Sequence, residues 1–150
     1  MYRLIGSVHT LTGLPGSIAD FLRAMDSVRK SIATAAGLSA NELRTMAGIA
    51  EEDGITPKQL ATSLELTSGA ITAITNSLVE RGLVSRSAQA HDRRSLLLAL
   101  TDTGHALMEA TYERYQEALS SATSGLATSD EELLVRALST LTASLRSDNT

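Results

Sequence analysis

The sequence of 150 residues predicts one domain that is mainly α-helical, with a small β-hairpin near the middle of the chain. Three observations predict this fold class. Apolar residues recur every three or four positions over long stretches, helix-capping motifs precede several of these stretches, and two β-prone runs flank one polar turn. We expect a central module over about residues 39–101, with long flanking helices within about 1–38 and 102–150.

The N-terminal segment predicts one long amphipathic helix from Ser17 to about Gly37. Its apolar residues follow helical spacing and would lie on one side: Ile18, Phe21, Leu22, Met25, Val28, Ile32 and Ala35. Residues 1–16 contain three glycines and a proline, so we expect a less regular segment there. A second helix should begin after Ser39, which forms a capping box with Glu42.

Two short helices are expected next. At the first, Thr56 suits the N-cap, Pro57 suits the first helical position, and Gln59 completes a capping box. The second starts at Thr67 and ends before Gly82, a residue that commonly terminates a helix. Its apolar residues lie on one face at helical spacing: Ile71, Ile74 and Leu78.

The β-hairpin is predicted from residues 83–87 and 95–100, which enclose a polar turn with a basic character. Ile55 is expected to pair with the hairpin as a strand of one residue. Helix, tight turn, helix and basic hairpin is the order of elements in a winged helix-turn-helix module. That architecture usually binds duplex DNA.

The C-terminal part predicts a helix over about 101–124, capped by Gly125, and a last helix opened by a capping box of Thr128 and Glu131. Leucines of the last helix form a stripe that needs a partner surface. The stripe could pack on the helix from Ser17 within one chain, or it could form a symmetric dimer, the commonest oligomer. For the dimer we expect the following interface residues: Ile18, Leu22, Met25, Leu134, Leu138, Leu141 and Leu145.

The net charge of −4 is unevenly distributed, because most of the excess acid follows residue 101. Residues 81–94 carry four arginines against one aspartate, so the predicted hairpin is locally basic. DNA affinity depends on the potential at the contact face, and salt screens distant charges beyond about 8 Å. The net negative charge of the chain therefore does not exclude DNA binding.

Composition excludes several other classes. The chain has no cysteine, which rules out disulfides and thiol-based redox sensing by this chain. Its longest apolar run, residues 96–100, is far shorter than the roughly 20 residues of a membrane helix. No signal peptide is recognisable, so we expect a cytoplasmic protein without a membrane partner. Neither a histidine pair at metal-ligand spacing nor a Gly-x-Ser-x-Gly elbow occurs, and we expect no enzyme activity and no cofactor.

Together these motifs resemble the MarR family of bacterial transcriptional regulators, from about Ile18 to Leu145. The most specific match is Asp92-Arg93-Arg94 followed by a β-run and Leu100-Thr101, which follows the family's wing pattern. Segments 56–61, 66–72 and 78–84 support it in order and spacing. The resemblance implies a homodimer with one winged module per protomer that binds double-stranded DNA and represses promoters. It also implies that the protein releases DNA when a small aromatic or phenolic effector binds. The sequence does not identify the residues that bind this effector.

The predicted DNA contacts fall into three groups. The exposed side of the second short helix would enter the major groove with Thr67, Ser68, Gly69, Thr72, Ala73 and Asn76. Asn76 could pair with adenine or bond a phosphate. The wing tip would place Arg94, together with Arg93, in the minor groove, oriented by Asp92, and His91 would also contact DNA. Lys58 and Arg86 would contact phosphates.

Two alternatives stay open. Ala73 and Ser77 are uncharged where many relatives carry a basic residue, which is compatible with a winged helix that binds only proteins. A metal-responsive regulator would require folding to bring together His9, His105 and the acidic residues 51–53. We expect no metal site, because dispersed histidines and carboxylates more often face solvent.

Overall fold

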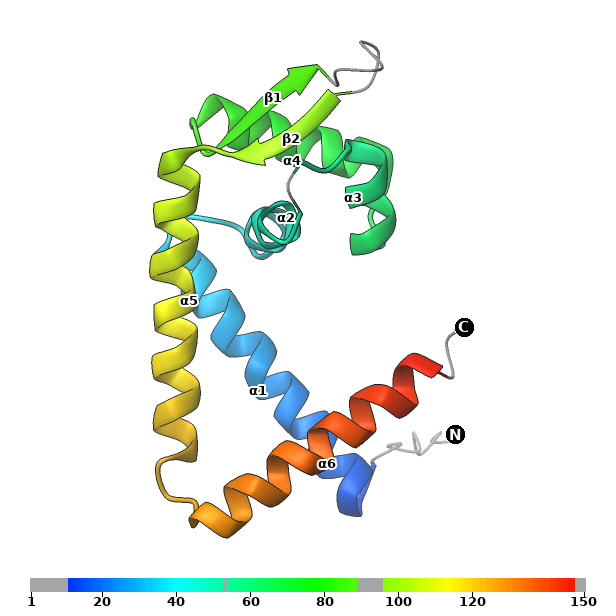
Figure 1. The fold of residues 1–150 in the computed structure, drawn as a ribbon, viewed down its shortest axis with the longest axis vertical. Helices are drawn as coiled ribbons and strands as arrows, with labels where there is room; N and C mark the ends of the chain where they lie inside the picture. The colour runs from blue at the N-terminus through cyan, green and yellow to red at the C-terminus, as the bar shows by residue number, and fades with distance from the viewer. Residues whose placement is uncertain (1–10, 53, 89–95, 148–150) are drawn as a thin grey trace, which may run out of the picture. The chain divides into compact units, whose positions relative to one another are not determined.

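The computed structural model describes residues 11–52, 54–88 and 96–147 (Figure 1). It confirms the predicted class, with six helices and one antiparallel hairpin among these residues. The elements are α1 (Gly13–Ala35), α2 (Ala40–Ala50), α3 (Pro57–Leu64), α4 (Ser68–Glu80), β1 (Val84–Ala88), β2 (Leu96–Leu100), α5 (Asp102–Thr123) and α6 (Thr128–Ser147). Contacts divide the chain into two units, Met1–Tyr115 and Gln116–Thr150.

The first helix begins earlier than predicted. We expected its start at Ser17, but α1 begins at Gly13 after the extended N-cap residue Thr12. Pro15 does not prevent this, because it is the third helical residue and the first four N–H groups of a helix have no intrahelical partner. At Gly16 a Cβ would lie 2.5 Å from the Leu11 carbonyl oxygen, so only glycine allows the chain to pack so closely there.

Both capping boxes predicted in the central module are formed. Ser39 Oγ accepts from Glu42 N at 3.1 Å, and the Glu42 carboxylate accepts from Ser39 N at 2.8 Å. Thr56 and Gln59 repeat the arrangement at 3.2 and 3.0 Å. Such caps fix the starts of α2 and α3 because each satisfies N–H groups that would otherwise lack a partner.

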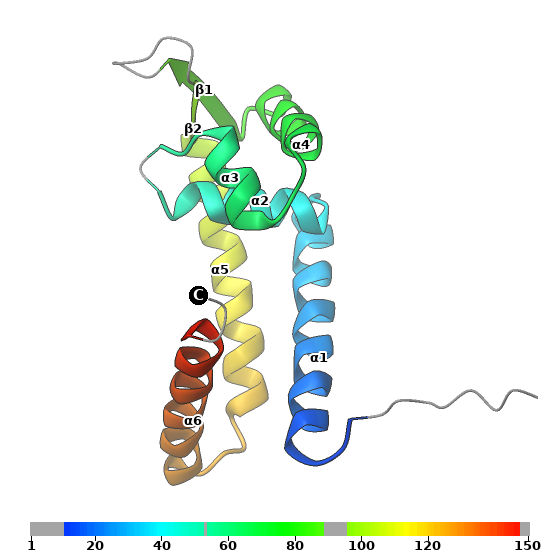
Figure 2. The same ribbon diagram turned by 90° about the vertical axis from the view of Figure 1, so that its right-hand side faces the viewer.

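Helices α2, α3 and α4 pack on one another and on the hairpin, as the two views in Figures 1 and 2 show. Their core is aliphatic and fully enclosed, with the following side chains at most 1% exposed: Met46, Ile49, Leu60, Ile71, Leu78 and Leu98. The hairpin pairs Val84 with Leu100 at its base. Ile55 pairs with Leu98 as predicted, through N–H···O bonds of 3.2 and 2.8 Å.

Gly82 directs the chain from α4 into the hairpin. It adopts φ +69° after the last turn of α4, and Leu83 N donates to the Leu78 carbonyl at 2.9 Å. This is the glycine-dependent helix ending that satisfies the last carbonyls. The joint is tied to α5 by Thr101, whose hydroxyl donates to the Gly82 carbonyl at 2.6 Å and accepts from Gly104 N at 3.1 Å. One threonine therefore connects the end of α4 with the start of α5.

The second unit differs from the prediction in two details. Thr128 is the first residue of α6 rather than its cap, and Glu131 N donates to the Ala127 carbonyl at 3.0 Å. The capping box expected at Thr128 is therefore not formed. Gly125 lies in the turn after α5 but not in the left-handed conformation of a capping glycine. No residue of α6 is buried, although the helix carries leucines along its length.

Candidate nucleic-acid interface

The face of α4 opposite the core carries small polar and apolar residues. All residues predicted to face DNA from this helix and its cap are exposed: Thr67, Ser68, Gly69, Thr72, Ala73 and Asn76. Ser68, Thr72 and Asn76 are four residues apart, so they form a row about 12 Å long on one side of the helix. Thr67 is the N-cap, and its Oγ1 accepts from Ala70 N at 3.2 Å.

Lys58 is exposed in the first turn of α3, where the prediction placed a phosphate contact. The predicted wing residues His91, Asp92, Arg93 and Arg94 lie outside the described residues. Their assigned roles at the DNA stay predictions. The strands that lead to them are described, and β1 packs against α4.

Arg86 on β1 does not extend freely into solvent. Its Nη2 donates to Asn76 Oδ1 at 2.6 Å and to Thr75 Oγ1 at 3.1 Å, although the residue as a whole is exposed. Thr75 is 1% exposed, and its hydroxyl also donates to the Ile71 carbonyl at 2.8 Å. Sequence reasoning missed Thr75 as a core residue, because its hydroxyl is satisfied within the helix and its methyl group packs like an apolar side chain.

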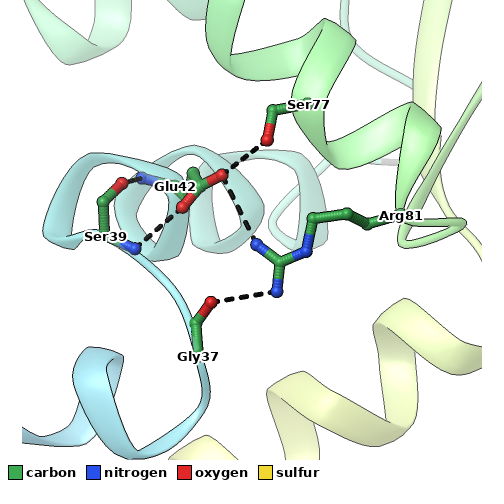
Figure 3. A network of polar contacts seen from close by, with 5 residues as sticks. All are labelled: Gly37, Ser39, Glu42, Ser77 and Arg81. Atoms are coloured by element: carbon green, nitrogen blue, oxygen red, sulfur yellow. Dashed lines mark hydrogen bonds and ion pairs between the residues drawn. The ribbon is translucent and has the colours of Figure 1, made fainter.

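A polar network holds α4 to the helices before it (Figure 3). The Glu42 carboxylate accepts from Ser77 Oγ at 2.9 Å and lies 3.5 Å from Arg81 Nη1. The other guanidinium nitrogen, Nη2, donates to the Gly37 carbonyl at 3.0 Å. Ser77 in the last turn of α4 and Arg81 at its C-cap are one turn apart, so Glu42 holds the C-terminal end of α4 against α2. No pattern in the sequence indicates this network beyond the capping box that contains Glu42.

The Glu42 network makes stability depend on pH. The hydrogen bond from Ser39 N, helped by those from the Ser77 and Ser39 hydroxyls and by the Arg81 charge, lowers the pKa of Glu42 below its ordinary value of 4.5, although burial opposes this. A carboxyl whose folded-state pKa is depressed contributes its full stability above the unfolded value. That contribution is lost as pH falls below 4.5 through the folded-state pKa.

We therefore expect Glu42→Gln to lower the free energy of unfolding at pH 7 by about 1 kcal/mol, because the charged acceptor is lost while the side-chain shape is kept. The difference from the wild type should shrink as pH falls from 5 to 3. Urea unfolding followed by circular dichroism at several pH values measures it. Glu51→Gln, at the exposed end of the same helix, controls for the loss of one negative charge. A difference that is constant over this range would contradict the assignment.

The residues predicted for a dimer interface are largely exposed in the single chain. Leu22 on α1 is 61% exposed, and Ile18 36%, while Met25 is half-buried. On α6 the predicted stripe is 37 to 66% exposed throughout: Leu134, Leu138, Leu141 and Leu145. Exposed leucines at this density are unusual on a helix that meets only water.

The described part of the chain bears on two other expectations. Within residues 11–52, 54–88 and 96–147, no helix is both long and apolar enough to cross a membrane. The same residues contain no group of three or more His, Asp or Glu side chains that could hold a metal ion. His9 and Asp53, which a metal site would need, lie outside the described residues.

Known proteins resemble this chain in sequence and in fold. A family model described as MarR family matches residues 36–95. YdgJ, an uncharacterised HTH-type transcriptional regulator of Bacillus subtilis strain 168, is 24% identical in an alignment 147 positions long that covers 90% of this chain and 90% of YdgJ.

Solved structures show the same fold. MepR, a transcription regulator of the Staphylococcus aureus multidrug efflux pump MepA, matches with a TM-score of 0.79 and 19% identity, over 89% of this chain and 99% of that one. The apo form of MarR from E. coli matches with a TM-score of 0.74 and 23% identity, over 87% and 98%. A MepR variant bound to an oligodeoxyribonucleotide matches with a TM-score of 0.67 and 20% identity, over 90% and 99%. The family model, the regulator and the structures agree: residues 36–95 match the MarR family model, and the chain has the winged-helix fold of the MarR and MepR structures.

Proposed function

We propose that this protein is a homodimeric repressor in the bacterial cytoplasm that binds a pseudo-palindromic operator. The observation that carries the proposal is the exposed row Ser68, Thr72 and Asn76 on α4, beside a hairpin whose sequence is basic. A helix of this kind presents hydroxyl and amide groups to base edges in the major groove. The MepR variant bound to an oligodeoxyribonucleotide, which has the same fold, supports this mode of binding.

The exposed leucines of α6 support self-association. Their spacing of four and three residues forms a narrow apolar stripe, the pattern by which helices pack on partner helices. Exposed apolar residues on the first half of α1, including Phe21 at 51% and Leu22 at 61%, would add to the interface. Two-fold symmetry would then present two α4 helices to two half-sites of one operator.

The proposal includes release of the operator DNA when a small aromatic or phenolic effector binds. The resemblance to the MarR family implies it, and MepR, which has the same fold, is a transcription regulator of a multidrug efflux pump. Isothermal titration of the dimer with salicylate as a probe, with and without operator DNA, tests it. Binding that is weaker in the presence of DNA would support effector-driven release, because the coupling between two ligands is reciprocal.

DNA binding is tested by fluorescence anisotropy with a duplex from the region upstream of the protein's own gene. Lys58, Arg93 and Arg94 from two protomers give a log–log salt slope of roughly −5, or roughly −7 if Arg86 also neutralises phosphates. A slope near zero would contradict the proposal. Absence of any DNA binding would favour a winged module that associates only with proteins, to which the uncharged face of α4 is also suited.

Lys58→Ala should reduce affinity for every duplex by a similar factor and make the slope less steep by about two for the dimer, since phosphate contacts carry no sequence information. Arg23→Ala is the matched control. Arg23 is an exposed cation in the middle of α1, paired with Asp20 outside the winged module. Removing its charge should change neither the slope nor the affinity appreciably. Equal effects of the two variants would show that only net charge matters.

A further inference from the structure

The side chain of Arg86 joins the hairpin to α4 through two adjacent acceptors. Its Nη2 atom contacts Asn76 Oδ1 at 2.6 Å and Thr75 Oγ1 at 3.1 Å. Thr75 is fixed in the core, where its hydroxyl donates to the carbonyl of Ile71 at 2.8 Å. The guanidinium is therefore anchored to the helix at a buried point, and Asn76 is the exposed part of the same contact.

This contact determines the orientation of the Asn76 amide. A guanidinium carries only donors, so the Asn76 atom that faces it must be the carbonyl oxygen. The NH2 group at the other end of the planar amide is directed away from Arg86, and it can only donate. Asn76 lies on the exposed face of α4, in the row with Ser68 and Thr72.

We infer that Arg86 makes Asn76 act towards the bases as a hydrogen-bond donor, so that Asn76 recognises guanine rather than adenine in the major groove. This inference rests on the proposed function. Guanine presents only acceptors at this part of its edge, O6 and N7, and either can accept from an N–H group of the amide. Adenine presents an amino donor beside N7, and a free asparagine matches it with its own carbonyl. Here the guanidinium takes one of the two lone pairs of that carbonyl and places a positive charge beside it, which disfavours the approach of the adenine amino group.

The inference changes the role expected for Arg86. A phosphate contact would position the protein without reading sequence. A side chain that orients a base-reading amide alters the base preference itself, although it touches no base. The two roles therefore differ in a measurable way: one changes affinity for all duplexes equally, and the other changes which base is preferred.

The test is selection from a random duplex library, followed by sequencing and by anisotropy on the selected duplexes. The wild type should prefer guanine over adenine by about fivefold to tenfold at one symmetry-related pair of positions. Arg86→Ala should shift that preference towards adenine, because the released amide can then use both of its groups. Lys58→Ala, which also removes one exposed cation, should weaken binding and leave the preferred bases unchanged. Circular dichroism checks that each variant is folded.

Asn76→Asp provides a second route if Arg86→Ala does not fold. The carboxylate keeps an acceptor for Arg86 but has no donor, so the preference for guanine should disappear and cytosine, whose N4 amino group donates, should gain. The inference is overturned if the wild type prefers adenine at this position, or if Arg86→Ala weakens all duplexes equally with unchanged base preference. A wild type that enriches no sequence at all would instead overturn the proposed function, and the inference with it.

Discussion

Gly104→Ala is expected to lower the free energy of unfolding by about 3 kcal/mol or more, one of the largest effects of a single methyl group in this chain. Gly104 is buried in the first turn of α5. A Cβ there would lie closer than 3.0 Å to the Leu83 carbonyl oxygen, 3.1 Å from the carbonyl carbon and 3.4 Å from Leu100 Cβ. Real Cβ atoms essentially never approach so closely, so part of the backbone must move.

The carbonyl of Leu83 cannot move without further losses. It accepts from Thr101 N at 3.1 Å, and Leu83 N is held by the Leu78 carbonyl at 2.9 Å. A shift of α5 would also break the 2.6 Å hydrogen bond from Thr101 Oγ1 to the Gly82 carbonyl. The substitution therefore loosens the joint between α4, the hairpin and α5. The higher helix propensity of alanine, about 1 kcal/mol, offsets only part of this loss.

Gly69→Ala is the matched control, because Gly69 also lies in the first turn of a helix. No atom lies within 4 Å of its added Cβ, and the residue is exposed. We expect this variant to be unchanged or up to about 1 kcal/mol more stable. Urea unfolding followed by circular dichroism compares both variants with the wild type. A Gly104→Ala protein as stable as the wild type would show that α5 can shift without breaking the joint.

The fold was largely predictable because its signals are local. The capping boxes at Ser39 and Thr56 join residues three apart, and such a motif forms wherever a helix starts at that point. The same motif failed at Thr128, since α6 starts one residue earlier than the motif requires. Pro15 was also misleading, because a proline ends a helix only beyond its first turn.

The candidate site was predictable only in part. Helical periodicity identified the exposed face of α4, since the core-facing residues leave only one side free. The contacts that orient this face were not predictable, because Arg86 is 10 residues from Asn76 and Arg81 is 39 residues from Glu42. Such pairs become neighbours only when the hairpin and α2 pack on α4. Arg86 accordingly looked like a phosphate contact in the sequence, although in the fold it holds Asn76.

Replacing both Leu138 and Leu141 with Glu is expected to convert the proposed dimer into a monomer and to weaken operator binding by about 100-fold. Both side chains lie in the centre of the exposed stripe of α6, where a charge would be buried against a partner. Loss of the second half-site removes the effective concentration that linked binding provides, commonly a factor of 10² to 10⁴. Sedimentation equilibrium measures the mass, and fluorescence anisotropy measures the affinity.

Ala143→Glu is the matched control, because position 143 lies on the opposite side of α6 from the stripe. This variant should remain dimeric and bind DNA as the wild type does. The thermal unfolding of the monomeric double variant separates the two interpretations of the stripe. No residue of α6 is buried in the single chain, so the winged module should stay folded as a monomer. A stripe that packs within its own chain would instead give a protein of unchanged mass with a lower Tm, and that outcome would contradict the dimer.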